Sequence, residues 1–139
     1  MKKVRQIIAF LGIFSICISC ASANEINITP RGWDIIAMTN YGFDIDDDGF
    51  MTAVGATTAI KSATKVTVGV YVERQKTGGW SVVPGMSWTS SSTTSTYVGI
   101  EKTRYLDKGW SYRLRVEHSA TGESGTEYAT SYSEAYYYG

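Results

Sequence analysis

Cysteine and histidine are scarce in this chain of 139 residues, and neither positive nor negative charge is in excess. Its two cysteines, Cys17 and Cys20, lie close to the N-terminus, and His118 is the single histidine. No disulfide can therefore staple the rest of the chain, and one histidine leaves too few ligands for a zinc site of the usual kind. Lysine and arginine number 13, as do aspartate and glutamate, so no basic excess points to nucleic acid as a partner.

The first residues predict export. Three basic residues lie within the first five positions, an apolar run covers residues 7–18, and the small residues Ala21-Ser22-Ala23 follow. This order is typical of a secretory signal peptide, here residues 1–23 with cleavage after Ala23. The run is shorter than the roughly 20 residues that a membrane span needs, so we expect membrane contact only through the transient signal peptide. The alternative is a lipoprotein anchored through Cys20, although Cys17 stands where a lipobox has an aliphatic residue.

Residues 24–139 are expected to form a single domain. They carry ten basic and thirteen acidic side chains, a net charge of about −3. A domain of this size buries roughly 65% of its unfolded surface, so a core without disulfides is sufficient to hold it together.

The stretch from Leu106 to Val116, L-D-K-G-W-S-Y-R-L-R-V, predicts a tight turn followed by a strand. Tyr112, Leu114 and Val116 alternate with charged residues, which is typical of a strand with one buried and one solvated face. The spacing of Leu106, Gly109 and Tyr112 resembles the corner before strand F of fibronectin type III and immunoglobulin-like domains. In those domains a tyrosine hydroxyl bonds back to the upstream backbone.

Similar patterns elsewhere predict an all-β, immunoglobulin/fibronectin-III-like sandwich of about seven antiparallel strands, and no stretch has helical periodicity. The expected strands cover residues 33–45, 50–58, 65–74, 80–88, 98–106, 110–118 and 127–138. Gly42 is expected to mark a bulge, and Pro84-Gly85 an edge strand or a bulge. We expect Thr89–Thr96 to be a loop, although threonine is also a good strand residue, and Ala120–Gly125 to be a turn.

Counting alternate positions assigns two aromatic rows to shared faces. Trp80, Val82, Met86 and Trp88 are expected on one side of their strand, and Tyr128, Tyr132, Tyr136 and Tyr138 on one side of the last strand.

A family resemblance accompanies these patterns. The chain has the leader Pro30-Arg31, the run V-Y-V-E-R-Q-K-T-G-G-W-S-V-V through Gly79-Trp80, and the G-x-x-Y-x-x-x-V strand from Gly109 to Val116. With its signal peptide it resembles an uncharacterised family of small exported β-sandwich proteins of Gram-positive bacteria. The resemblance implies a single β-sandwich and supplies neither a function nor a site.

The run Asp44-Ile45-Asp46-Asp47-Asp48-Gly49 matches the first half of a calcium loop. Carboxylates at alternate positions would make Asp44, Asp46 and Asp48 the candidate calcium ligands. The closing glutamate is missing, because Gly55 stands at position 12, and strands rather than helices flank the run. We therefore expect an acidic hairpin turn, with no metal site and no cofactor.

Catalytic equipment is sparse. A Ser-His-Asp arrangement would have to use His118, which continues the buried positions of its strand, and no G-x-S-x-G motif is present. A glycosidase pair could be drawn from the glutamates, but any chain with this many carboxylates offers one. These glutamates are Glu101, Glu117, Glu123, Glu127 and Glu134. We expect the protein not to be an enzyme.

Aromatic residues are abundant, with four tryptophans and ten tyrosines. Neighbours alternate on a strand, so Tyr136, Tyr137 and Tyr138 cannot all face inward. Exposed rings can stack on sugars or anchor a partner, and tyrosine is also favoured on strands for its own sake. We therefore expect a non-catalytic secreted binding module for a glycan or a protein surface. A small secreted effector, antimicrobial or toxin-like, and a hydrolase with an unrecognised site are the alternatives.

Overall fold

A computed structural model describes residues 33–139, so the expected signal peptide, its cleavage site after Ala23 and the alternative anchor Cys20 lie outside the described residues. Within that range eight strands form, one more than expected, and there is no helix that is long and apolar enough to cross a membrane. The strands are β1 (Ile36–Ile45), β2 (Phe50–Ala59), β3 (Lys65–Lys76), β4 (Gly79–Ser92), β5 (Tyr97–Tyr105), β6 (Trp110–Gly122), β7 (Gly125–Tyr132) and β8 (Tyr136–Tyr138).

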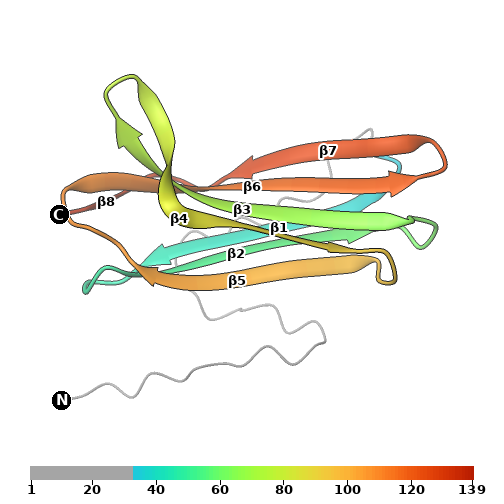
Figure 1. Cartoon of the computed structure of the whole chain (residues 1–139), viewed down its shortest axis with the longest axis horizontal. Coiled ribbons are helices and arrows are strands. Elements are labelled where there is room, and N and C mark those ends of the chain that lie inside the picture. The colour runs from blue at the N-terminus through green and yellow to red at the C-terminus, as the bar shows by residue number, and fades with distance from the viewer. Residues whose placement is uncertain (1–32) are drawn as a thin grey trace, which may run out of the picture.

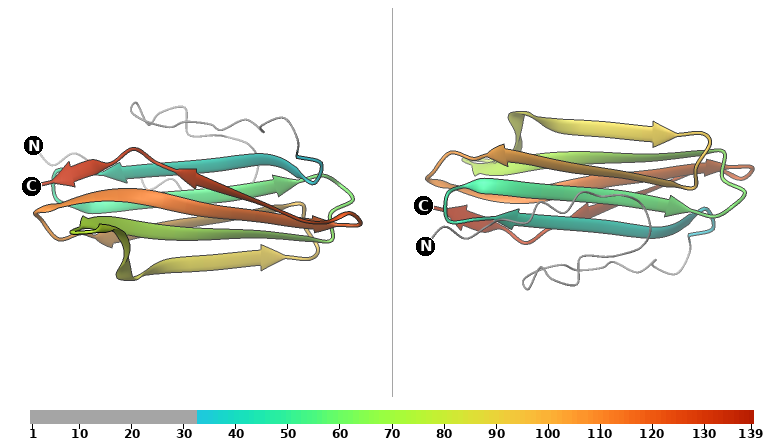
Figure 2. Two further views of the ribbon diagram at one scale, coloured as in Figure 1. Left: turned by 90° about the horizontal axis from the view of Figure 1, so that it is seen from above. Right: turned by 90° about the horizontal axis from the view of Figure 1, so that it is seen from below.

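The strands form two facing sheets, which confirms an all-β sandwich (Figure 1). The smaller sheet has the order β1-β2-β5, and the larger has the order β4-β3-β6-β7 with β8 also paired to β6. All of these neighbours are antiparallel. Figure 2 shows the two layers from above and below, with β4 and β5 running along the same side of the sandwich.

Alternating residues of β3 and β6 supply the centre of the core. Val66, Val68, Val70 and Val72 are at most 1% exposed, and burial of each valine contributes roughly 1.5–3 kcal/mol. On β2, Gly55 allows the sheets to approach closely, because a Cβ there would lie 2.6 Å from Val70 and 2.8 Å from Val116. The predicted alternation of Tyr112, Leu114 and Val116 is confirmed, since all three are buried.

The corner before β6 also has the predicted hydrogen bond. The Tyr112 hydroxyl donates to the backbone oxygen of Asp107 at 2.7 Å, and Gly109 has the positive φ of 86° that the turn requires. Burial of the ring, together with the nearby Asp107 charge, raises the pKa of the Tyr112 hydroxyl.

The face assignments on β4 were wrong beyond Pro84-Gly85. Tyr71 pairs with Ser87 and Glu73 with Val82, so the single residue of β3 between these pairs opposes four residues of β4, 83–86. Three extra residues are an odd number, so the alternation reverses across the irregularity. Val82 pairs with Glu73 and Trp80 with Gln75, so both side chains point to the outer face. Trp88 instead pairs with Val70 and, like Met86, packs against the core.

The row of tyrosines at the C-terminus is split in the same way. Residues 133–135 interrupt the last strand, and Arg115 pairs with Tyr132 while Tyr112 pairs with Tyr136. One extra residue reverses the alternation, so Tyr132 faces outward and Tyr136 packs inward on Phe43 with ring centroids 6.1 Å apart. As expected for neighbouring tyrosines, Tyr137 is 71% exposed while Tyr136 and Tyr138 are half-buried.

Three boundary predictions also differ from the structure. Residues 89–92 extend β4, so the expected loop is confined to 93–96, because β-propensity and pairing with β3 prevail over serine content. Residues 120–122 likewise extend β6. The β1 pairing runs without a shift through Gly42, and its irregularity lies between Ile36 and Met38 instead.

Candidate functional site: an arginine–aromatic face

The outer face of the larger sheet gathers arginine and aromatic side chains from four strands. The register places Glu73 of β3 opposite Arg113 of β6, and Tyr71 opposite Arg115. Arg115 also lies opposite Tyr132 of β7. The arginine–aromatic face is defined here by six residues, Tyr71, Glu73, Trp80, Arg113, Arg115 and Tyr132.

A single carboxylate organises the two arginines. Glu73 is 6% exposed, and its Oε2 accepts a hydrogen bond from Arg113 Nε while its Oε1 accepts one from Arg115 Nε, each at 2.8 Å. Two cations on one carboxylate satisfy both of its oxygens, which a nearly buried charge requires. Glu117 Oε1 accepts a further hydrogen bond from the same side chain, donated by Arg115 Nη1. Burial acts to lower the pKa of Arg115, but the hydrogen bond to Glu73 and the charge of Glu117 outweigh it and raise that pKa.

Stacking completes the arrangement. The guanidinium carbon of Arg113 lies 4.5 Å from the Trp80 ring and 4.5 Å from the Tyr132 ring, so the cation is held between two aromatic rings. Arg115 lies 4.3 Å over the ring of Tyr71. Each such contact is worth roughly 0.5–1 kcal/mol when exposed and more when desolvated, so together they fix the orientation of three rings.

The face still presents surface to solvent. Tyr132 is 47% exposed, and Tyr128, two pleats along β7, is 77% exposed. Among residues 33–139 no acceptor forms a hydrogen bond with the terminal nitrogens of Arg113, whose side chain is 25% exposed. Arg113 can therefore offer a planar pair of N–H donors beside two rings, a combination suited to sugar or carboxylate recognition.

The acidic run forms the predicted hairpin turn between β1 and β2. Asp46 Oδ1 accepts hydrogen bonds from the backbone N–H groups of Asp48 and Phe50, each at 3.0 Å, so this carboxylate holds the turn. Asp44 lies on β1 opposite Thr52. Within the described part of the chain, no three histidine, cysteine, aspartate or glutamate side chains gather in a way that could hold a metal ion.

His118 is a core residue that links the two sheets. It is 1% exposed, and its Nδ1 lies 2.9 Å from Thr57 Oγ1 of β2 while its Nε2 lies 3.2 Å from Ser131 Oγ of β7. Thr57 donates its hydroxyl proton to the Thr67 carbonyl, so it accepts from Nδ1–H, and Nε2 accepts from Ser131. Burial lowers the pKa of His118 to about 4. Both members of the Ser131–His118 pair are buried, with at most 7% of either residue exposed.

The five candidate glutamates do not converge on one site. They are distributed over β5, β6, the β6–β7 turn, β7 and the segment before β8. Glu127 accepts backbone hydrogen bonds from Asp34, Ile35 and Ile36 at 2.7 to 2.8 Å and so ties the start of β1 to β7. The bond from Ile36, followed by those from Asp34 and Ile35, lowers the pKa of Glu127.

Comparison with known proteins adds no relative, because no family model, curated protein or solved structure matches the chain. The sequence indicated that some aromatic residues must be exposed, but it did not assign Trp80, Arg113 and Tyr132 to one cluster. Their contact depends on the bulge at Pro84-Gly85, which turns Trp80 outward. One residue in the sequence did point to this cluster. Glu73 lies at an outward position of β3, and a carboxylate there needs cationic partners on the neighbouring strands.

Proposed function

We propose that this protein is a non-catalytic, exported binding module with an immunoglobulin-like sandwich, and that the arginine–aromatic face binds a glycan. The strand order β1-β2-β5 against β4-β3-β6-β7, with the tyrosine corner, supports the immunoglobulin-like assignment. The observation that carries the function is the stack of Trp80, Arg113 and Tyr132 on a sheet face that no other described strand covers.

The chemistry around the stack favours a glycan over a protein surface. The outward positions that continue this face along β3, β4 and β7 are mainly hydroxyl side chains, with Thr67, Ser87, Thr89 and Thr130 among them. Serine is depleted from protein interfaces, whereas sugars are recognised by flat rings and convergent polar groups. Rings already oriented by Arg113 and Arg115 lose little conformational freedom on binding.

A sedimentation assay with insoluble polysaccharides tests this proposal. Chitin, cellulose, xylan and peptidoglycan are each mixed with the protein, and depletion of protein from the supernatant is measured. We expect at least one to bind, and Tyr132→Ala and Trp80→Ala to weaken binding by about tenfold or more, as for anchor residues of an interface. Tyr97→Ala is the matched control, because Tyr97 is 48% exposed but lies on the opposite sheet. Absence of binding to every polysaccharide, or equal losses in all three variants, would contradict the proposal.

Export is tested separately by the intact mass of protein recovered from the culture medium of a secreting host. We expect a chain that begins at Asn24, as cleavage after Ala23 requires. A diacylglyceryl adduct on Cys20 would instead establish the lipid-anchored alternative.

A further inference from the structure

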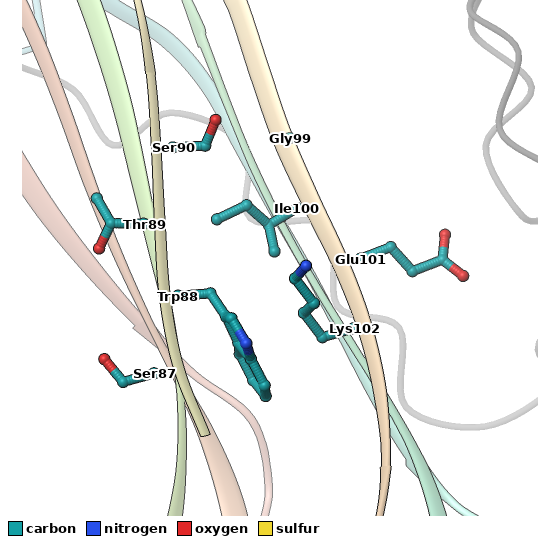
Figure 3. Close-up of a pocket in the computed structure, with 8 residues that line it drawn as sticks. All are labelled: Ser87, Trp88, Thr89, Ser90, Gly99, Ile100, Glu101 and Lys102. Atoms are coloured by element: carbon teal, nitrogen blue, oxygen red, sulfur yellow. The ribbon is translucent and has the colours of Figure 1, made fainter. Parts of the chain in front are cut away.

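A groove lies between the edge strands of the two sheets. β4 and β5 run side by side, yet β4 pairs only with β3 and β5 only with β2 among the described strands. The groove has a volume of about 600 Å³ and is lined by residues 87–90 of β4 and 99–102 of β5. Figure 3 shows Trp88, Ile100 and Lys102 directed into the space between the strands, while Glu101 points away from it.

The hydrogen-bond pattern shows which backbone groups of β5 are free. Ala59 N–H donates to Thr96 O at one end of the β2–β5 ladder, and Leu106 N–H donates to Gly49 O at the other. In an antiparallel ladder every second residue bonds the partner strand, so the even-numbered residues from 96 to 106 bond β2. The N–H and C=O groups of Gly99 and Glu101 therefore point to the open edge.

This edge is the most regular in the sandwich. Its pairing with β2 runs without a shift from Tyr105 to Tyr97, whereas β1 and β4 carry irregularities and residues 133–135 interrupt the edge formed by β7 and β8. Proteins usually blunt exposed edges with such bulges or with proline. A straight edge with free backbone groups is a template onto which an extended peptide can pair.

The groove beside this edge is cationic. Lys102 and Arg104 point inward from β5, and the Arg104 guanidinium lies 5.5 Å from the Trp88 ring. Within residues 33–139 neither cation forms an ion pair. A strand added to β5 would place alternate side chains over these cations and over Trp88.

We propose that the edge of β5 binds an extended, acidic segment of a partner protein by strand addition. Carboxylates on every second residue of that segment would meet Lys102 and Arg104, while its backbone bonds Gly99 and Glu101. A second copy of this chain fits less well. Two β5 strands paired about their centre would place Glu101 directly opposite Glu101 of the other copy, and like charges directly opposite each other are destabilising.

The test uses two capped nine-residue peptides, one of alternating glutamate and valine and one of alternating lysine and valine, titrated into isotope-labelled protein. We expect the glutamate peptide alone to shift the amide resonances of residues 87–90 and 97–103 and to slow exchange of the Gly99 and Glu101 amides. Lys102→Glu should weaken its binding about fivefold or more. Glu101→Pro should abolish the protection, and it removes no bond to β2 because the Glu101 N–H points outward.

Two controls keep the outcome decisive. Glu101→Gln keeps the backbone N–H, so it should bind as the native chain does. Trp80→Ala removes a ring of the arginine–aromatic face, so it should leave peptide binding intact whatever its effect on glycans. Equal binding of both peptides, shifts confined to other strands, or sedimentation showing self-association through β5 would overturn the proposal. If Glu101→Pro does not fold, Lys102→Glu and the exchange data on the native chain still decide it.

Discussion

Protonation of His118 is expected to destabilise the fold by a measurable amount. The imidazole is neutral in the core, and burial lowers its pKa to about 4, whereas an unfolded chain has a histidine pKa near 6.5. Between these values the unfolded state binds a proton that the folded state does not. The free energy of unfolding therefore falls as the pH is lowered from about 6.5 to about 4.

The magnitude follows from the difference between the two pKa values. One pKa unit corresponds to about 1.4 kcal/mol, so the full loss attributable to His118 is about 3 kcal/mol. Such a loss is a substantial fraction of the free energy of unfolding of a typical domain, which is about 5–15 kcal/mol. Most of it falls above pH 4.5, where ordinary carboxylates are still mostly ionised.

Two measurements check this expectation. The first is the NMR titration of the imidazole C–H resonance, which is unambiguous because the chain has a single histidine. The second is urea unfolding at a series of pH values between 7 and 4. His118→Gln serves as the comparison, since its amide can still reach hydroxyl partners but does not titrate. A histidine pKa near 6.5, or the same pH slope in the native chain and in His118→Gln, would refute the buried neutral imidazole.

Three further predictions concern the fold and the acidic turn. Tyr112→Phe removes the hydrogen bond to Asp107 and should lower the free energy of unfolding by roughly 0.5–1.5 kcal/mol. Tyr112→Ala also leaves a cavity and should lower it by about 3 kcal/mol or more. Both are measured by denaturant unfolding, and equal, negligible losses would mean that the corner contributes nothing to stability. The pKa of Glu127 is lowered in the folded state, so its contribution to stability is present above the usual glutamate pKa and is lost as the pH falls through the lowered pKa. Glu127→Gln should therefore reduce the dependence of the free energy of unfolding on pH below about pH 4.5. At constant ionic strength, millimolar Ca²⁺ should shift the melting temperature little relative to chelator. A shift of several degrees that Asp46→Asn abolishes would make Asp44, Asp46 and Asp48 ligands.

The strands with uninterrupted alternation could be predicted from the sequence. On β3 and β6 each side chain's face follows from its position in the chain, because neighbouring residues of a strand point to opposite sides. The valines of β3, and Tyr112 with its corner, were assigned correctly for this reason. The acidic hairpin turn and the exposure of Tyr137 follow from equally local rules.

The faces beyond an irregularity could not be predicted in this way. The sequence at Pro84-Gly85 and at residues 133–135 does not show how many extra residues the strand accommodates there. An odd number moves every side chain that follows to the opposite face of the sheet. Trp88 and Tyr136 were therefore assigned to the wrong side relative to Trp80 and Tyr132. That number is set by pairing with β3 and β6, which lie far away in the sequence.

The sequence by itself determined the class of the fold, because alternation, turn residues and the absence of helical periodicity are local properties. Only the tertiary structure decided which side chains meet. The contact of Arg113 with Trp80 and Tyr132 joins three strands, and that of His118 with Thr57 and Ser131 joins both sheets. The free edge of β5 likewise exists because no described strand pairs beside it. These features depend on register and strand order, which arise when the sheets bury their common core rather than from any single stretch of residues.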